Sequence, residues 1–205
     1  MAFKLFTIFL VLFLIQAAFG KSIDSSKSAE SVEEKESIKP KHLLFIYAAG
    51  SFLQLIQQFS DKAADSSRQL LKDDSLLAND QPEVLEFKQN LTMFVEKYDA
   101  NKETEEVFDI MELYGQTVDH YFDLDDDELT PESTFILDVL NKYKHKEIQA
   151  EFIKEFDEFV EKFKQIFEKS KSQLGEPELE WYEKFQTLTD FVKRIEALGN
   201  FIALA

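Results

Sequence analysis

The residue types that do acid–base, nucleophilic or metal chemistry are scattered through this chain without a catalytic pattern. Its histidines, His42, His120 and His145, are separated by long stretches, and cysteine is absent. The chain has no glycine-rich phosphate loop, no Gly-x-Ser-x-Gly turn and no His-Glu-x-x-His pair, the arrangements through which such residues usually act. We therefore expect a protein that is not an enzyme, with no catalytic residue and no cofactor.

An acidic run from Asp123 to Glu128 is the best candidate for a cation site. Calcium favours carboxylate oxygens at alternating positions of a loop with glycine sixth and glutamate twelfth. Counted from Asp123, the sixth residue is Glu128 and the twelfth is Thr134, so the pattern fails. His120 nearby would add only one nitrogen ligand. We predict no metal site and interpret the run as a solvated acidic turn before the next helix.

A glycosylation sequon at Asn90-Leu91-Thr92 is a candidate modification site. Asn90 lies about a right angle away from the apolar stripe of its predicted helix, so its side chain is expected to reach solvent. The sequon has meaning only if the chain enters the secretory pathway, which the N-terminus indicates.

Residues 1–20 have the pattern of a secretory signal peptide. Lys4 precedes an apolar run from Leu5 to Ile15, and small residues lead up to a cleavage site after Gly20. The run is too short to cross a bilayer, which takes about 20 apolar residues, so we expect no membrane span. Residues 21–41 are rich in Ser, Glu and Lys and are expected to form a disordered tail. The protein is therefore predicted to be secreted and extracellular.

Charge narrows the range of partners. The net charge is −17, which repels nucleic-acid phosphates and anionic lipid head groups. We expect no nucleic-acid partner. Without cysteine the protein also has no disulfides, so a secreted domain of this sequence must depend on the burial of its apolar residues.

The most regular of the predicted elements is a helix from Ile148 to about Ser170. Large apolar residues recur in it at spacings of three and four, which place them on one stripe about 100° wide. The opposite side is charged. The stripe consists of Ile148, Phe152, Phe156, Phe159, Phe163 and Phe167.

A second segment, from Leu43 to Ile56, is apolar nearly all round and continues as an amphipathic helix toward Leu70. We expect neighbouring helices to wrap it on all sides, as they do the central helix of a bundle. Contact of this half-helix with lipid is the alternative. Its strict stripe is Phe45, Ala49, Phe52, Ile56, Phe59 and Ala63.

Other helices are predicted from apolar periodicity and from proline at helix starts. One begins at Pro82 and ends near Asp99 or Asn101, and the next runs from about Lys102 to Phe122. A third begins at Thr130-Pro131, with either a break near Lys144 or continuation into the phenylalanine helix. The last is expected to run unbroken from Pro177 to the C-terminus on a seven-residue repeat, typical of a coiled-coil seam. That repeat is Trp181, Phe185, Leu188, Val192, Ile195, Gly199 and Ile202.

The predicted fold is all-α: a single-domain antiparallel bundle of five or six amphipathic helices over residues 42–205. The short connection at Gly175 predicts that the last helix forms a hairpin with the phenylalanine helix, large rings facing smaller side chains.

Two functions remain open at this point. The first is a secreted interaction or regulatory factor with a protein partner. The alternative is a carrier of hydrophobic molecules such as lipids or fatty acids, because the chain is rich in phenylalanine. The candidate ligand-lining residues of such a carrier are Phe45, Phe52, Phe152, Phe156 and Phe163.

Overall fold

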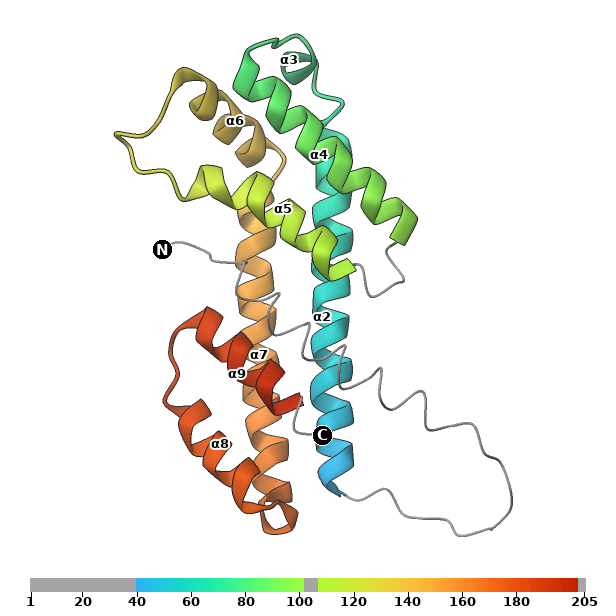
Figure 1. Ribbon diagram of the computed structural model, residues 1–205, viewed down its shortest axis with the longest axis vertical. Helices are drawn as coiled ribbons and strands as arrows, with labels where there is room; N and C mark the ends of the chain where they lie inside the picture. Colours follow the sequence, from blue (N-terminus) through green and yellow to red (C-terminus); the bar gives the residue numbers. More distant parts are fainter. Residues whose placement is uncertain (1–39, 102–106, 203–205) are drawn as a thin grey trace, which may run out of the picture. The chain divides into compact units, whose positions relative to one another are not determined.

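The computed structural model describes residues 40–101 and 107–202, and every regular element in these ranges is helical (Figure 1). The all-α class is confirmed, but these ranges hold eight α-helices rather than five or six. The predicted signal peptide and tail lie outside the described residues, except that the first described helix already begins at Pro40. The elements are α2 (Pro40–Leu70), α3 (Asp74–Leu77), α4 (Pro82–Asn101), α5 (Val107–Phe122), α6 (Pro131–Lys142), α7 (His145–Ser170), the 3₁₀ turn η2 (Lys171–Gln173), α8 (Glu176–Gln186) and α9 (Phe191–Ile202).

The additional helices arise from aspartate caps. Asp73 accepts hydrogen bonds from the backbone N–H groups of Ser75 and Leu76 at 2.9 and 3.2 Å, which starts α3. Asp190 accepts one from the N–H of Lys193 at 2.9 Å and so starts α9. The prediction of one unbroken last helix is therefore wrong, because a capped start interrupts its repeat.

At the junction of α6 and α7 the structure decides between the two open alternatives. The Thr130 side chain accepts a hydrogen bond from the N–H of Ser133, and the Ser133 hydroxyl accepts one from the N–H of Thr130, which closes the start of α6. The helix ends at Lys142, and Lys144 adopts a left-handed conformation with φ of 62°. α7 begins at the next residue, so α6 and α7 are two separate helices with a break at Lys144.

Within the described residues the chain forms two compact units, to both of which α2 and α7 contribute. The first unit is Leu55–Lys154. In it α4, α5 and α6 pack on one another, and α2 contributes Phe59, whose ring stacks on Phe152 of α7 at 4.7 Å. One face of α4 is buried in this unit, through Val84, Phe87, Leu91, Phe94 and Tyr98.

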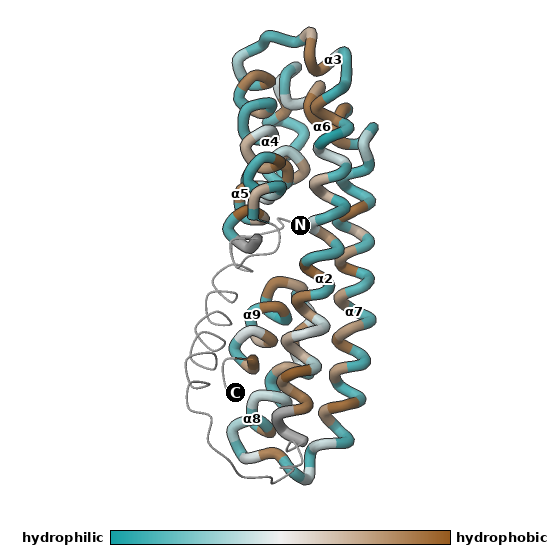
Figure 2. Tube along the Cα trace, turned by 90° about the vertical axis from the view of Figure 1, so that its right-hand side faces the viewer, coloured by the Kyte–Doolittle hydropathy of each residue, from teal (hydrophilic) through white to brown (hydrophobic). Residues whose placement is uncertain are grey.

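The second unit consists of residues 40–54 and 155–202. Here α8 packs on α9, and both present aromatic rings to α7. The predicted stripe of α7 is buried from Phe152 to Phe167, while the chain alternates between hydrophobic and hydrophilic residues along this helix (Figure 2). Phenylalanine rings of α7 therefore pack against aromatic rings of α8 and α9. The expectation that smaller side chains lie opposite the phenylalanine helix is wrong. Tyr182, Leu198 and Phe201 are buried, whereas Trp181, Leu188 and Val192 of the predicted repeat stay partly exposed.

Candidate functional site

The five candidate ligand-lining phenylalanines do not all belong to one unit. Phe45, Phe52, Phe156 and Phe163 lie in the second unit, and Phe152 lies in the first. All five are buried.

Each of the four in the second unit contacts further rings. Phe45 stacks on Phe201 with centroids 4.4 Å apart, and Phe156 meets Phe52 at 6.3 Å. Phe163 meets Phe201 edge-on at 5.4 Å. These are ordinary aromatic packing distances, so the rings cover one another.

Aromatic packing continues along α7 into α8. Phe167 and Tyr182 stack at 3.9 Å, and Trp181 lies 4.4 Å from Phe201. The indole N–H of Trp181 donates to the backbone carbonyl of Ala197 at 2.9 Å. This bond holds the partly exposed indole between α8 and α9.

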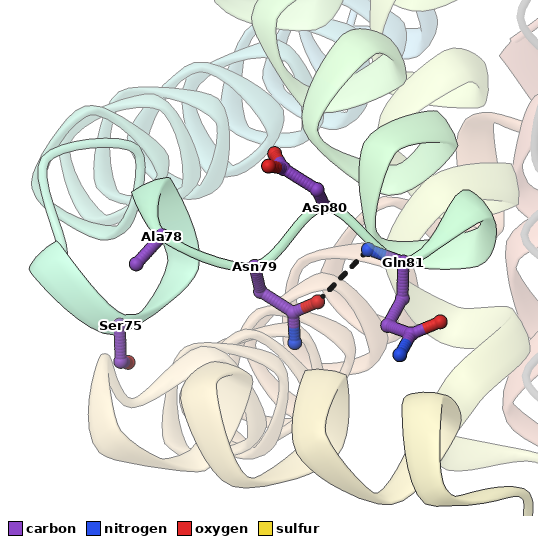
Figure 3. Close-up of a pocket in the computed structure, with 5 residues that line it drawn as sticks. All are labelled: Ser75, Ala78, Asn79, Asp80 and Gln81. Carbon is purple, nitrogen blue, oxygen red and sulfur yellow. Dashed lines mark hydrogen bonds between the residues drawn. The ribbon is translucent and has the colours of Figure 1, made fainter.

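Three hollows on the described part of the chain lie elsewhere and are open to solvent. One is lined by residues 75 and 78–81, where the side-chain oxygen of Asn79 accepts a hydrogen bond from the N–H of Gln81 at 3.0 Å (Figure 3). Two more lie along the exposed faces of α4 and α7, between Lys88 and Glu96 and between Glu161 and Lys169. None of the three is lined by a phenylalanine, and their linings are largely polar side chains.

An apolar face of α2 is left open in the second unit. Leu43, Ile46 and Leu53 are 51%, 60% and 37% exposed, and Gly50 between them is exposed as well. The opposite side of the same segment is buried through Leu44, Phe45, Ala48, Ala49 and Phe52. The expectation that neighbours wrap this half-helix on all sides is therefore wrong. We call Leu43, Ile46, Gly50 and Leu53 the open face of α2.

Length and composition alone would let residues Leu43–Leu70 of α2 cross a bilayer. This is a weak indication, because the core helix of a soluble protein meets the same criteria. Phe59, Ala63 and Leu70 in the second half of the helix are buried in the first unit.

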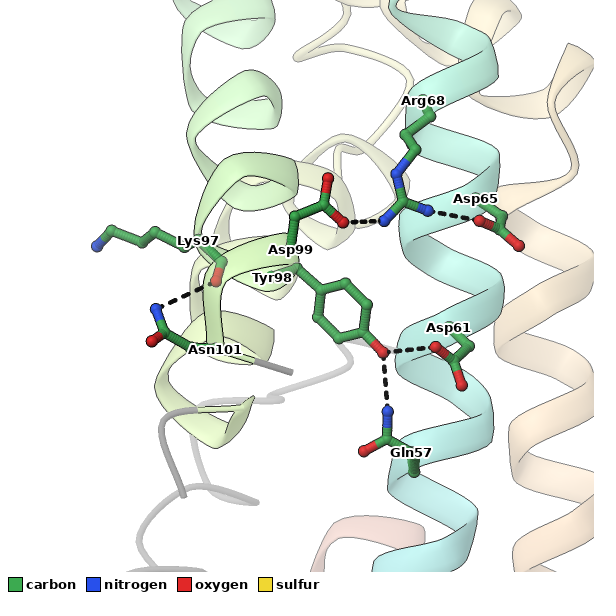
Figure 4. A network of polar contacts seen from close by, with 8 residues as sticks. All are labelled: Gln57, Asp61, Asp65, Arg68, Lys97, Tyr98, Asp99 and Asn101. Atoms are coloured by element: carbon green, nitrogen blue, oxygen red, sulfur yellow. Dashed lines mark hydrogen bonds and ion pairs between the residues drawn. The ribbon is translucent and has the colours of Figure 1, made fainter. Parts of the chain in front are cut away.

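A polar network joins α2 to α4 in the first unit (Figure 4). The hydroxyl of Tyr98 donates to Asp61 at 2.8 Å and accepts from the amide of Gln57 at 2.9 Å. Arg68 pairs with Asp65 on its own helix and with Asp99 on α4. Burial, together with the bond to Asp61, raises the pKa of Tyr98, so the hydroxyl keeps its proton. The network is a structural link between two helices.

The most unusual polar groups are buried between α5 and α7. The hydroxyl of Tyr114 lies 2.8 Å from Nδ1 of His145, and the amide of Gln149 donates to Asp119. Three buried polar atoms have no hydrogen-bond partner: Nε2 of His145, Oδ2 of Asp119 and, on α2, the hydroxyl oxygen of Ser67.

Burial sets the protonation of both groups. It lowers the pKa of His145 to about 4 and, with help from the charge of Asp123, raises the pKa of Asp119 to about 8. Both groups are uncharged at neutral pH.

Sequence reasoning missed both of these buried groups. His145 stands among lysines in the sequence, and Asp119 lies off the apolar stripe of α5. Neither position carries a periodic signal. Since both side chains are enclosed by the protein, they cannot reach a substrate, and a structural role follows. Among the residues that the structure describes, no three His, Asp or Glu side chains come together as metal ligands.

Asn90 is half-buried on α4. Within its sequon, Leu91 is fully buried and the hydroxyl of Thr92 donates to the carbonyl of Lys88 at 2.7 Å. Glycosylation therefore stays a prediction for a side chain at the edge of the packed stripe.

No protein-family model matches this chain, and neither a curated protein nor a solved structure shows significant similarity to it.

Proposed function

We propose that the protein is a secreted, non-enzymatic factor that acts by binding another protein through the open face of α2. The signal peptide over residues 1–20 and a single antiparallel bundle over residues 42–205 are parts of this proposal. The observation that carries it is the exposure of Leu43, Ile46 and Leu53 on a helix whose other side is buried.

Exposed apolar side chains grouped on one face favour an interaction surface, whereas isolated ones are common on any protein. Leu43, Ile46, Gly50 and Leu53 follow one another at spacings of three and four, so they form a continuous stripe about one helix wide. Such a stripe fits the apolar side of an amphipathic helix on the partner.

The alternative, a carrier of lipids or fatty acids, has less support. A carrier needs an enclosed apolar space, and the candidate lining rings instead contact one another at 4.4 to 6.3 Å. The open hollows are lined largely by polar residues such as Asp80, Lys88 and Glu161.

Native mass spectrometry of the protein, purified from the fluid that contains it, distinguishes the interaction factor from the carrier. We expect the mass of a protein complex for the wild type and a loss of that complex for Ile46→Glu. Leu85→Glu, at an exposed leucine of α4, is the matched control and should keep the complex. A mass increment of a lipid in place of a protein would support the carrier, and free monomer in all three samples would contradict the proposal.

A further inference from the structure

The four residues of the open face of α2 have the same spacing whether they are counted from the N-terminal or the C-terminal end. Leu43, Ile46, Gly50 and Leu53 are separated by three, four and three residues. If a second α2 lies antiparallel across this face, Leu43 of each copy meets Leu53 of the other. Ile46 of each copy then meets Gly50 of the other. A two-fold axis requires one patch to be complementary to itself, and this pattern meets that requirement.

Size complementarity follows the same pairing. Ile46 is the most exposed of the large apolar residues, at 60%, and it projects from the helix as a knob. A Cβ atom built on Gly50 would find no heavy atom within 4 Å, so the surface is open there. In the antiparallel arrangement each Ile46 side chain enters the space above the partner's Gly50. Knobs that fill holes in this way, at three- and four-residue spacings, are how two helices pack closely.

The segment at the centre of this face is uncharged, so it does not oppose contact with a second copy. No charged residue occurs from Leu43 to Ser60, although the chain as a whole is 31% charged with a net charge of −17. Two copies therefore meet without like charges in direct contact, and at physiological salt the more distant charges are screened beyond about 8 Å.

We infer that the open face of α2 pairs with the same face of a second copy, in an antiparallel helix–helix contact with Ile46 of each chain over Gly50 of the other. This rests on the proposed function, since it takes the open face of α2 as the binding surface and identifies the partner. The small face corresponds to a weak dimer, with dissociation on the order of micromolar or weaker.

Sedimentation velocity on the protein secreted from the complete sequence tests the pairing, over about 1 to about 200 µM. We expect a monomer–dimer equilibrium. Ile46→Glu should weaken it by about tenfold or more, because two carboxylates would be buried against apolar surface. Leu85→Glu should leave it unchanged. A wild type that stays monomeric throughout this range would overturn the inference.

Gly50→Gln separates pairing from folding. A Cβ atom at position 50 has no neighbour within 4 Å in the monomer, and glutamine favours helix more than glycine does, so the melting temperature should rise by about 2 °C. In the dimer the same side chain occupies the space that receives Ile46, so association should weaken by about tenfold. A variant that is more stable and associates as well as the wild type would contradict the proposed contact.

Because the chain has no cysteine, orientation can be tested by single substitutions. Antiparallel pairing predicts that a mixture of Ile46→Cys and Gly50→Cys chains forms mixed disulfides faster than either variant forms its own. Faster self-linking of each variant would indicate parallel pairing and overturn the antiparallel contact. One outcome is that sedimentation shows a monomeric wild type while native mass spectrometry shows a different protein bound to the wild type and absent from Ile46→Glu. In that case this inference fails and the proposed function stands.

Discussion

In the second unit aromatic rings of α7 meet aromatic rings of α8 and α9, whereas in the first unit buried polar side chains join the helices as well. The buried polar residues described in the second unit are Ser170 and Glu178, close to the turn between α7 and α8. Those of the first unit include Asp73, Asp119 and His145. Apolar packing depends little on pH, while buried titratable groups make stability depend on it. The two units should therefore respond differently to the same perturbations.

Phe163→Ala should have the largest effect, because Phe163 is fully buried in the second unit and contacts rings of both α8 and α9. Removing a buried phenyl ring from a packed core costs about 3 to 5 kcal/mol of unfolding free energy. Denaturant unfolding followed by circular dichroism measures this.

The control for Phe163→Ala is Leu85→Ala, at an exposed side chain, which should change the unfolding free energy by no more than about 0.5 kcal/mol. A loss below about 1 kcal/mol for Phe163→Ala would mean that the neighbouring rings are loosely packed and would revive the carrier hypothesis.

A pH effect of intermediate size should come from the first unit. Asp119 has a folded-state pKa of about 8 against an ordinary value of 3.8. Between these two pH values the carboxyl group of Asp119 keeps its proton in the folded protein and has lost it in the unfolded chain. Its contribution to stability therefore falls as pH rises from about 4 to about 8. His145, with its pKa lowered from 6.5 to about 4, contributes stability that rises with pH in that interval. The two slopes oppose each other up to pH 6.5, and above it only the loss due to Asp119 remains.

We therefore expect the unfolding free energy to fall by about 1 to 1.5 kcal/mol between pH 6.5 and 8, because the slope of about 1.4 kcal/mol per pH unit is reduced by His145 near pH 6.5 and by the ionisation of Asp119 near pH 8. Asp119→Asn should remove this fall, because the amide can still accept from Gln149 but cannot ionise. Melting curves at closely spaced pH values test it. A wild type with constant stability across this range would show that Asp119 is ionised in the folded protein.

The sequence predicted the burial of the five phenylalanines of the α7 stripe, from Phe152 to Phe167, because one strong period places them all on the same side; Ile148, at the start of the stripe, is only half-buried. The same reasoning failed for α8 and α9, since the seven-residue repeat runs through Asp190 without a change of spacing. The capping hydrogen bond of Asp190 overrides that repeat. Local backbone bonds of this kind depend on a single side chain and leave no trace in periodicity.

The candidate site was harder to predict for a different reason. The apolar character of residues 43–56 was evident, but periodicity cannot tell which side of a nearly uniform helix neighbours will cover. Only the packing of Phe45 and Phe52 against α9 and α7 reveals Leu43, Ile46 and Leu53 as the uncovered side. The hydrogen bonds of His145 with Tyr114 and of Asp119 with Gln149 likewise arise only from the tertiary contact of α5 with α7.

Two hydroxyl deletions compare the units directly. Tyr98→Phe in the first unit removes short hydrogen bonds to Asp61 and Gln57 and should cost about 1 kcal/mol. Tyr182→Phe in the second unit removes a long bond of 3.4 Å to the carbonyl of Lys164 and a hydrogen bond with the exposed Glu168, whose loss water can replace, and it keeps the ring stacked on Phe167. It should therefore cost less. Denaturant midpoints of the two variants, measured side by side, decide the order, and an equal or larger loss for Tyr182→Phe would contradict the contrast between the units.

The smallest effect should come from Arg194, a charged side chain that contacts the aromatic core of the second unit. Its guanidinium pairs with Asp157 at 2.8 Å and lies 5.3 Å from the ring centre of Phe156. Asp157 is half exposed, so the ion pair contributes at most about 1 kcal/mol, and contact with the ring adds a similar amount at most. Arg194→Gln should lower the unfolding free energy by about 0.5 to 1 kcal/mol at low salt. Between about 0.05 and about 1 M sodium chloride the difference from wild type should shrink, because salt screens the pair with Asp157.

Arg194→Met keeps the apolar stem over Phe156 and should lose less than Arg194→Gln. If the difference instead persists unchanged in high salt and Arg194→Met loses as much, then the interaction that matters is a desolvated charge in the core, and the second unit depends on polar contacts as the first does.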